Sequence, residues 1–496
     1  MTLKTKHLFT FLLVCLSVWM MHPLAAAKDA PSAAATMQML AKAKKALVSV
    51  KQTVSKSAYE ETIAISKSGF ICDQKRGWVI TTLGPVGYGA SMSSYELTFS
   101  GGQKLEAKSL YRDPLYDIEV LVFEPSKLLS PISQLTVFAP KEQLDEDVLL
   151  LTKNNEQEIV QQGTISHLYE TTGVLPKHVL RVSLNTPGSS VGGVALNAKG
   201  ELLGLILSAD QTFAQILCKG YLKEILGCLR KGRKPLRFLL KDAMLSSMSL
   251  PDAVKYLDFP KERLEAFLNR YPDALAFGLV IVRAQDHSPL RVGDVVVALN
   301  GKPCGPSLFA FQKKLSAASG KEVSLQVMRH GKELTLKCQR LDAWPYVISK
   351  MILFGGALFY EADLLMHALY DVPLKALMVS KVLPGSVFAG VFSAFPSRDP
   401  VSVARLIRCD QSQVKTLADL EKLIPQLSTK PYFSVFYKDY SCAVQGGTLM
   451  TNRAPRVGFV DFIASTSIPE KLTWSDQKNE WFVEPLVLSN QKCAML

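Results

Sequence analysis

The side chains that could support covalent chemistry gather near the segment from Leu184 to Leu207, which reads LNTPGSSVGGVALNAKGELLGLIL. A Pro-Gly pair leads into Ser189 and Ser190, and Val191 stands directly before a Gly-Gly pair. Acyl transfer by a serine needs the hydroxyl nucleophile, a base that takes its proton, and a carboxylate that orients the base. The segment therefore offers a serine hydroxyl, and the base and the carboxylate must come from other parts of the chain.

The N-terminus has the pattern of a secretory signal peptide. Lys4 and Lys6 form a basic start, residues 8–21 form an apolar run, and Ala25-Ala26-Ala27 offers a small-residue cleavage site. The apolar run is short for a transmembrane helix, and an uncleaved signal anchor is the alternative. We therefore predict an exported protein, located in the periplasm or cell envelope of a bacterium.

The composition is that of an ordinary globular protein, with 48% hydrophobic and 20% charged residues among 496. A chain of this length is too long for one hydrophobic core and suggests about three domains. The formal net charge is +13, and the excess is spread out except for the basic segment from Lys219 to Arg237. That segment is most simply a helix with cations at its C-terminal end, followed by a linker. Binding to an anionic lipid or cell-wall surface is the alternative, and nucleic acid is not expected as a partner because aromatic residues are not interleaved with the basic ones.

The cysteines give no indication of a metal or redox site. Nine are present, one of them in the predicted signal peptide, and none forms a C-x-x-C pair or a Cys/His pair at zinc spacing. Export would permit disulfides, but their pairing does not follow from the spacing. We predict no metal and no cofactor.

Short apolar segments separated by turn residues dominate the first half of the mature chain, a pattern typical of a β-barrel or β-sandwich. Expected strands and hairpins lie at 69–82, 95–110, 118–123, 148–152 and 179–184, and expected helices at 37–54, where the helix feeds a strand, and at 218–231. The pattern then becomes mixed α and β, with a helix at 307–319 and a hairpin at 323–338 in a first module, and a helix at 414–424 in a second. Because the two modules repeat one order of elements, they form an internal repeat. The last 46 residues, from Thr451, show no motif.

This order of elements resembles the HtrA/Deg family, which comprises exported trypsin-like proteases followed by two PDZ peptide-binding domains. The similar segments are KSGFICDQKRGWVITT (family GSGFII…GYILTN), DPLYDIEVLVF (DP.TDLAVL), GTIS (GIVS), GGVALNAKGELLGL (GGALVNLNGELIGI) and VGDVVVALNGKP (GDVI…NGKPV). The resemblance implies a mainly β fold with α+β modules, that is, a chymotrypsin-like double β-barrel followed by two PDZ-like domains. The domain boundaries that we predict are 1–27 for the signal peptide, 28–232 for a degenerate trypsin-like domain, 233–342 and 343–450 for two PDZ-like domains, and 451–496 for a C-terminal extension of unknown role.

The catalytic triad of the family is incomplete in this chain at two of three positions. Asp117 matches the aspartate at the end of DP.TD. Gly84 matches the histidine of TNNHV, because this chain reads TTLGPV, and Val191 matches the serine before Gly-Gly. The loop before Val191 is one residue longer than in the family, so Ser190 is the only alternative nucleophile. The resemblance therefore implies remnant triad positions at Gly84, Asp117 and Val191, and no intact triad.

No histidine of the barrel region is expected to replace the missing base. His167 and His178 are the only two, and the resemblance puts both in the second barrel, whereas the family's histidine comes from the first. Loss of a triad histidine costs roughly 10⁶ in kcat. We expect Asp117 to be solvated, or to bond backbone N–H or hydroxyl groups such as those of Thr81 or Thr82, because a buried carboxylate without partners is unfavourable.

A PDZ domain adds a peptide strand to a sheet edge and binds the peptide carboxylate with backbone N–H groups of a glycine-containing loop. In the first module the corresponding residues are Phe238, Leu239 and Leu240, and Leu240 takes the place of the glycine, which favours binding of an internal strand over C-terminal capture. The second module keeps its glycines in Phe354-Gly355-Gly356-Ala357-Leu358. A buried strand with a tight turn is the alternative for that segment.

The sequence thus predicts an exported pseudoprotease that acts as a peptide- or protein-binding scaffold or chaperone in the cell envelope. The alternative is an active serine endopeptidase for protein quality control that uses Ser190 as a shifted nucleophile. A third hypothesis is a structural or adhesive role for the basic segment and residues 451–496. Expected partners are unfolded or C-terminal peptide segments of envelope proteins. The resemblance implies a homo-oligomer, commonly a trimer, and membrane association is compatible but not required.

Overall fold

The computed structural model describes the chain between residues 33 and 486, with internal gaps. The described ranges are 33–55, 63–83, 92–154, 157–185, 191–272, 275–382, 385–389, 391–392, 403–440, 443–445, 448–450, 456–461, 469–475, 478 and 480–486. None of the helices in these ranges is long and apolar enough to span a bilayer.

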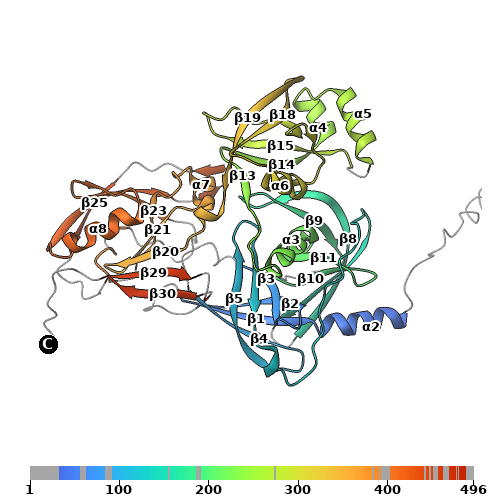
Figure 1. Ribbon diagram of the computed structural model, residues 1–496, viewed down its shortest axis with the longest axis horizontal. Helices are drawn as coiled ribbons and strands as arrows, with labels where there is room; N and C mark the ends of the chain where they lie inside the picture. Colours follow the sequence, from blue (N-terminus) through green and yellow to red (C-terminus); the bar gives the residue numbers. More distant parts are fainter. Residues whose placement is uncertain are drawn as a thin grey trace, which may run out of the picture.

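Two closed β-barrels come first in the chain, drawn in blue to green in Figure 1. Their strand orders are β1-β2-β3-β6-β5-β4 and β10-β11-β12-β9-β8-β7. The strands are β1 (Leu47–Ser55), β2 (Ile63–Asp73), β3 (Trp78–Thr82), β4 (Met92–Thr98), β5 (Lys104–Asp113), β6 (Ile118–Val122), β7 (Asp147–Asn154), β8 (Gln157–Thr172), β9 (Lys177–Leu184), β10 (Val194–Asn197), β11 (Leu202–Ala209) and β12 (Phe213–Cys218). Buried and exposed residues alternate along β5, as a barrel with a filled interior requires. The predicted double β-barrel is confirmed.

Helices flank the barrels at both ends. Helix α2 (Ala33–Lys44) precedes the first barrel, a short 3-10 helix, η1 (Pro125–Lys127), follows β6, and α3 (Lys219–Leu229) follows the second barrel. One face of α3 packs against the barrels with fully buried Tyr221, Leu222 and Ile225. Because this apolar face has helical spacing, the sequence predicted the helix within two residues of its bounds.

The first C-terminal module, yellow-green to gold in Figure 1, is a seven-stranded sheet in the order β13-β19-β18-β16-β15-β14, with β17 paired to β16. Its elements are β13 (Phe238–Leu240), β14 (Ala243–Ser249), α4 (Leu250–Tyr256), α5 (Lys261–Arg270), β15 (Phe277–Ala284), β16 (Val295–Leu299), β17 (Lys302–Pro303), α6 (Leu308–Ala317), β18 (Glu322–Arg329) and β19 (Lys332–Asp342). Helix α6 begins after Ser307, whose hydroxyl accepts a hydrogen bond from the N–H of Ala310. Strand β14 lies at the sheet edge, and with α6 it forms the walls of the pocket described below.

The second C-terminal module is a nine-stranded sheet in the order β28-β25-β23-β22-β21-β20-β29-β30, with β24 paired to β23. A 3-10 helix, η3 (Trp344–Tyr346), leads into it. Its elements are β20 (Lys350–Phe354), β21 (Ala357–Glu361), α7 (Leu364–Tyr370), β22 (Leu377–Val382), β23 (Val403–Cys409), β24 (Ser412–Gln413), α8 (Leu417–Leu427), β25 (Tyr432–Tyr440), β28 (Arg456–Asp461), β29 (Glu470–Ser475) and β30 (Glu480–Pro485), and a separate pair of strands is formed by β26 (Ala443–Gln445) and β27 (Thr448–Met450). Because β28 pairs with β25 and β29 pairs with β20, the sheet continues beyond the predicted boundary at residue 450.

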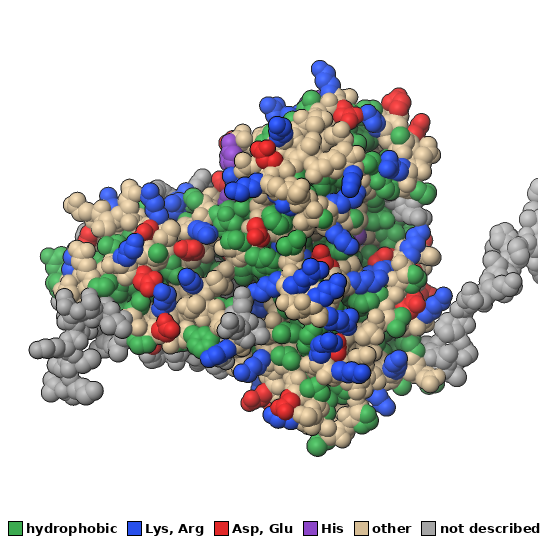
Figure 2. All heavy atoms as spheres, in the orientation of Figure 1, with side chains coloured by type: hydrophobic (Ala, Val, Ile, Leu, Met, Phe, Trp, Pro, Cys, Tyr) green, Lys and Arg blue, Asp and Glu red, His purple; other side chains and the backbone are tan. Residues whose placement is uncertain are grey.

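The basic segment after α3 lies where the barrels meet the first module, and Figure 2 shows a concentration of Lys and Arg side chains at the centre of this face. Arg230 and Arg76 share the carboxylate of Asp73, with nitrogen–oxygen distances of 3.5 and 3.0 Å. Lys234 lies over the ring of Trp344, 5.5 Å from its centroid. The segment is a helix end followed by a linker, as its simpler interpretation predicted.

Candidate functional site

The segment around Val191 joins the two barrels at the predicted nucleophile position. Gly84 and Ser190 lie outside the described residues. Val191 is 37% exposed, and its carbonyl oxygen accepts a hydrogen bond from the N–H of Ser68 on β2 at 2.9 Å. Gly192 has φ +82°, and a Cβ there would lie 2.1 Å from the carbonyl oxygen of Ser68. Only glycine fits so close a crossing, so close packing between the barrels explains this glycine.

Asp117 lies on the turn between β5 and β6, half-buried, with φ 59°. Its carbonyl oxygen accepts a hydrogen bond from the N–H of Leu83 at 3.2 Å, which ties the turn to the end of β3. The hydroxyl of Thr81 donates to the carbonyl of Ser68 at 2.6 Å, and Thr82 Oγ1 is buried without a partner among the described residues. The prediction that these two hydroxyls bond Asp117 is therefore wrong, because the single proton of Thr81 is used across the β2–β3 pair and Thr82 makes no such contact.

Two buried lysines supply the positive charge around Asp117. Lys67 comes from β2 of the first barrel, and Lys177 comes from β9 of the second. Burial lowers the pKa of the Lys67 ammonium, a shift that Glu119 and then Asp117 oppose. Burial likewise lowers the pKa of the Lys177 ammonium, and Asp117 and Asp113 oppose that shift. The remnant triad carboxylate is therefore surrounded by lysine charge from both barrels.

Lys67 is the centre of a buried polar network at the end of β3. Its Nζ donates to the carbonyl oxygens of Thr82 and Leu83, the latter at 3.3 Å, and to Glu119 Oε2 at 3.3 Å. Glu119 also accepts a hydrogen bond from the hydroxyl of Tyr95 at 2.6 Å, and its side chain is fully buried. The network fixes the backbone just before the predicted histidine position. Sequence reasoning missed it, although a lysine at the first position of KSGFICD, where the family segment has glycine, was the available signal.

The five described histidines make their contacts away from Asp117. His178 is buried, with Nε2 2.7 Å from the carbonyl oxygen of Leu168 and Nδ1 3.1 Å from Ser307 Oγ, and burial lowers its pKa. His167 is exposed on β8. The other three lie in the C-terminal modules, where His287 is 3.3 Å from Asp242, His330 is 3.6 Å from Asp258, and His367 is 2.9 Å from Gln285. Within the part of the chain that the structure describes, no imidazole is placed to act with Asp117.

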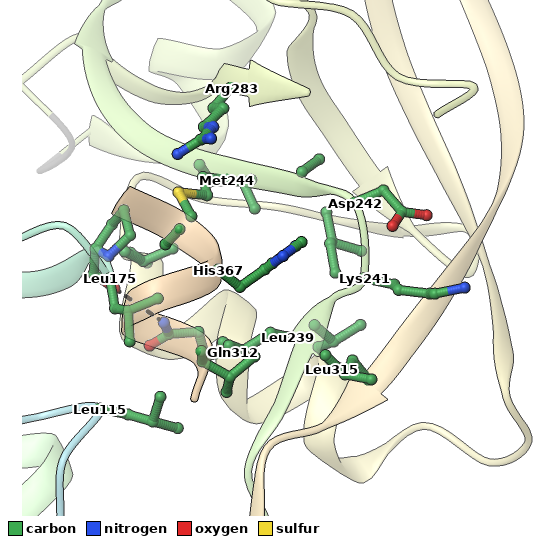
Figure 3. Close-up of a pocket in the computed structure, with 18 of the residues that line it drawn as sticks. Leu115, Leu175, Leu239, Lys241, Asp242, Met244, Arg283, Gln312, Leu315 and His367 are labelled. Atoms are coloured by element: carbon green, nitrogen blue, oxygen red, sulfur yellow. Dashed lines mark hydrogen bonds between the residues drawn. The ribbon is translucent and has the colours of Figure 1, made fainter. Parts of the chain in front are cut away.

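A pocket lies where the first module meets the barrels and the second module. Its walls come from β14 and α6, from the turns near Leu115 and Leu175 of the two barrels, and from α7. Figure 3 shows Arg283 and Met244 at one end, Leu115 at the other, and His367 between them. The cavity volume is about 80 Å³, roughly half that of a cavity that holds benzene. The pocket therefore has room for one apolar side chain.

The predicted carboxylate loop of the first module is the strand β13, which pairs with β19. The N–H of Phe238 donates to the hydroxyl of Ser316 at 3.2 Å, and the N–H of Lys241 donates to a carbonyl of β19 at 2.9 Å. Leu239 and Leu240 line the pocket, whereas Phe238 is not among its walls. The segment therefore contributes apolar side chains to the pocket, and the N–H groups at both of its ends already have partners.

The glycine segment of the second module is a tight hairpin turn. Phe354 and Ala357 pair across it between β20 and β21, and Gly355 and Gly356 have φ +56° and +76°. A two-residue turn with positive φ at both positions is the type I′ hairpin turn, which joins strands without distorting their twist. Phe354, Ala357 and Leu358 are buried. This geometry matches the alternative interpretation, a buried strand with a tight turn, and peptide binding at this segment stays a prediction.

Helix α6 is bonded to the second barrel by side chains. The hydroxyl of Tyr221 donates to Gln312 Oε1 at 2.8 Å, and Gln312 Nε2 donates to the carbonyl of Pro176 at 3.3 Å. Ser307, the N-cap of α6, contacts the buried ring of His178 at 3.1 Å. Because α6 is one wall of the pocket, these bonds hold the pocket in place on the barrel.

Nothing in the described residues is arranged as a metal or disulfide site. No group of three or more His, Cys, Asp or Glu side chains there could hold a metal ion. The described cysteines are unpaired thiols, namely Cys72, Cys218, Cys228, Cys304, Cys338 and Cys409. Burial raises the pKa of the Cys304 and Cys338 thiols to about 11, so at neutral pH they are apolar contacts rather than reactive thiolates.

Two solved structures similar to this chain are HtrA-type proteases or serine endoproteases. The HtrA-type protease AlgW with decapeptide is 16% identical, with a TM-score of 0.41, and the alignment covers 62% of this chain and 98% of that chain. The serine endoprotease from Yersinia pestis is 17% identical, with a TM-score of 0.37, covering 63% of this chain and 99% of that chain.

Curated proteins and family profiles match the same region more directly. Pro-apoptotic serine protease NMA111 of Yarrowia lipolytica is 22% identical over 341 residues, which cover 65% of this chain and 34% of that protein. Uncharacterized protein RP187 of Rickettsia prowazekii is 31% identical over 141 residues, which cover 28% of this chain and 72% of that protein. The chain thus spans about a third of the NMA111 protein that it matches. Residues 67–205, which run from the first barrel across the Gly-Gly segment, match the family described as Trypsin-like peptidase domain. With this domain, its relatives and the double barrel on which they agree, the chain belongs to the HtrA/Deg family.

Proposed function

We propose that the protein is an exported HtrA-like pseudoprotease that binds peptide segments of envelope proteins, as a scaffold or chaperone. The observation that carries the proposal is the charge around Asp117, where buried lysines lie in place of an imidazole. A general base must be neutral and within hydrogen-bond reach of the proton it takes. Lys67 does not meet this requirement, because its ammonium group already donates to two carbonyls and to Glu119. With Gly84 and Val191 at the other two triad positions, the cleft is suited to stability rather than to acyl transfer.

The binding role rests on the first module, which we interpret as PDZ-like. Its pocket lies between an edge strand, β14, and a helix, α6, and its walls are mainly apolar. An edge strand beside a helix is the arrangement that accepts an extended peptide segment. We include in the proposal a homo-oligomeric state and the two C-terminal modules as a PDZ-like pair, as the family resemblance implies.

The catalytic half of the proposal is tested with the chain from residue 28 to residue 496 and unfolded casein. We expect no cleavage above the buffer background and no labelling by a fluorophosphonate probe. The Ser190→Ala variant should behave identically in both assays. Casein cleavage that disappears in Ser190→Ala, with labelling of Ser190 in the parent protein, would establish the active endopeptidase instead.

The binding half is tested by fluorescence anisotropy with labelled peptides that end in a large apolar residue. Met244→Trp fills the pocket from β14 and should abolish binding. Met248→Trp is the matched control, because Met248 is also half-buried on β14 but is not part of the pocket wall. Equal binding by both variants would place the peptide elsewhere on the protein.

A further inference from the structure

We infer that Arg283 is the anion-binding residue of this pocket, and that the pocket takes an apolar side chain next to a carboxylate, as at a peptide C-terminus. The inference rests on the proposed peptide binding and adds the anchoring residue and the ligand chemistry. Arg283 lies on β15 opposite Met244 of β14. Figure 3 shows Arg283 beside Met244 at one end of the pocket, whereas the charged ends of Lys241 and Asp242 point away from it.

The guanidinium of Arg283 has no partner of its own among the described residues. It is half-buried, and no ion pair or hydrogen bond joins it to another described side chain or carbonyl. The carboxylate of Asp242, which also lines the pocket, lies 3.3 Å from His287 instead. By contrast, the buried Arg237 pairs with two carboxylates, at 2.9 and 2.8 Å. A guanidinium on an apolar wall without a carboxylate is suited to an anionic ligand, which it can bind through two parallel hydrogen bonds.

The backbone of the first module offers no alternative anchor in β13. The N–H groups of Phe238 and Lys241 already donate to other acceptors, and β13 is paired with β19 along its length. The side chain of Leu240 stands where the family's loop has glycine, so it also keeps a ligand carboxylate away from this backbone. A carboxylate that enters the pocket therefore needs a side-chain partner, and Arg283 is placed to provide it.

The edge of β14 limits how far a peptide can pair. Thr171 at the end of β8 contacts Ser246 through the two hydroxyls, and its Oγ1 accepts a hydrogen bond from the N–H of Ser247 at 3.4 Å. The second barrel thus occupies the edge from Ser246 onward, and only residues 243–245 are open to an added strand. A peptide running antiparallel to β14 with its carboxylate near the pocket can pair only through its last few residues.

The test uses the chain from residue 28 onward and two labelled decapeptides that end in leucine, one with a free carboxylate and one with a C-terminal amide. The wild-type protein should bind the acid about 10-fold or more tightly than the amide, as expected for a hydrogen-bonded charge pair. Arg283→Gln should lower the affinity for the acid to that for the amide and leave the amide affinity unchanged, and Arg283→Lys should recover part of the difference. Arg263→Gln, an exposed arginine of the same module paired with Glu333, is the control. A tripeptide with the same end should bind within about threefold of the decapeptide.

The outcomes separate this inference from the proposed function. If Arg283→Gln still discriminates acid from amide, Arg283 is not the anchor. If the wild-type protein binds both peptides equally and Met244→Trp abolishes both, peptide binding stands and the anion site is wrong. A wild-type protein that binds neither peptide overturns the proposed function together with this inference. A decapeptide that binds far more tightly than the tripeptide overturns the limit set by Thr171.

Discussion

The remnant catalytic cleft and the pocket of the first module treat charge in opposite ways. In the cleft, charged groups pair within the protein, since Lys67 lies 3.3 Å from Glu119 and interacts favourably with Asp117. In the pocket, Arg283 stands on an apolar wall without a partner among the described residues. Polar groups that are satisfied internally stabilise one conformation, whereas an unsatisfied cation beside an apolar cavity favours a ligand. The comparison supports a structural role for the cleft and a binding role for the pocket.

The largest effect should come from breaking the charge pairing of the cleft. Lys67→Met leaves the buried carboxylate of Glu119 without its cation, which should lower the free energy of unfolding by about 3–5 kcal/mol. Urea denaturation followed by circular dichroism measures the loss. The Lys67→Met/Glu119→Gln double variant should recover most of it, because the buried charge is removed together with its partner. Lys104→Met, which breaks the exposed pair with Glu96, should cost less than about 1 kcal/mol. Equal losses for the two lysine variants would contradict a structural role for the cleft network.

The next largest effect concerns α7, the helix of the second module that lines the pocket. Its N-cap, Asp363, is buried and accepts a hydrogen bond from the N–H of Met366 at 2.8 Å, and burial raises its pKa from 3.8 to about 6. Because the folded state then holds the proton more tightly than the unfolded state, the stability that this group contributes is complete below pH 3.8 and is lost as the pH rises through about 6. Asp363→Asn keeps a good N-cap without the titration. It should therefore be more stable than the wild type by up to about 3 kcal/mol at pH 8, a difference that narrows toward pH 4.

The matched control for Asp363 is Asp419 of α8, where the sign is opposite. Burial acts to raise the pKa of Asp419, but hydrogen bonds from the backbone of Lys415 and Thr416 outweigh it and lower the pKa. Asp419→Asn should therefore lose its disadvantage as the pH falls, in urea denaturation at the same two pH values. The same pH trend for both variants would mean that the burial of Asp363 does not control its titration.

Much of the fold could be predicted because it follows from local patterns. The helix expected at 414–424 is α8, Leu417–Leu427, and its start moves by three residues because Thr416 and Asp419 form a capping box. The hairpin expected at 323–338 is β18–β19. Strands β28 to β30 could not be predicted, because they pair with strands formed by distant parts of the chain rather than with a hairpin neighbour.

The site was less predictable, because its important side chains depend on register and on contacts between modules. A lysine in a strand is expected to face solvent, and only the closed barrel shows that Lys67 and Lys177 face Asp117. Arg283 follows an ordinary strand sequence, and its role depends on α7 and on a barrel turn that close the other walls of the pocket. Gly84, Asp117 and Val191 needed only alignment to a motif, so the sequence could identify them.

A smaller effect should follow from loosening the pocket wall. Ser307→Ala removes the N-cap hydroxyl of α6 and leaves the Nδ1 of buried His178 without its partner. The two losses should together lower the free energy of unfolding by about 1–2 kcal/mol. Affinity for a peptide acid should fall as well, because α6 is then held less firmly against the barrel. Thr416→Ala, which removes the N-cap of α8 away from the pocket, should lower stability by about 1 kcal/mol without changing peptide affinity. A Ser307→Ala variant with unchanged peptide affinity would show that the pocket does not depend on this bond.

The smallest effect is expected in the cleft itself, from Val191→Ser. The substitution restores a serine directly before Gly-Gly, and because Val191 is 37% exposed, stability should change by less than about 0.5 kcal/mol. We nevertheless expect no casein cleavage and no fluorophosphonate labelling. A serine hydroxyl without a base is a poor nucleophile, and position 84 is glycine.

Adding Gly84→His to Val191→Ser sharpens the comparison further. An imidazole introduced beside Asp117 would have to compete with the charges of Lys67 and Lys177, which already neutralise that carboxylate. These cations also oppose the imidazolium that forms when histidine takes the proton of serine. The double variant should therefore stay far below an intact triad, and Lys177→Met in the same background should raise its activity. Cleavage by Val191→Ser alone would instead reveal a base in the cleft, and the contrast between a structural cleft and a binding pocket would no longer hold.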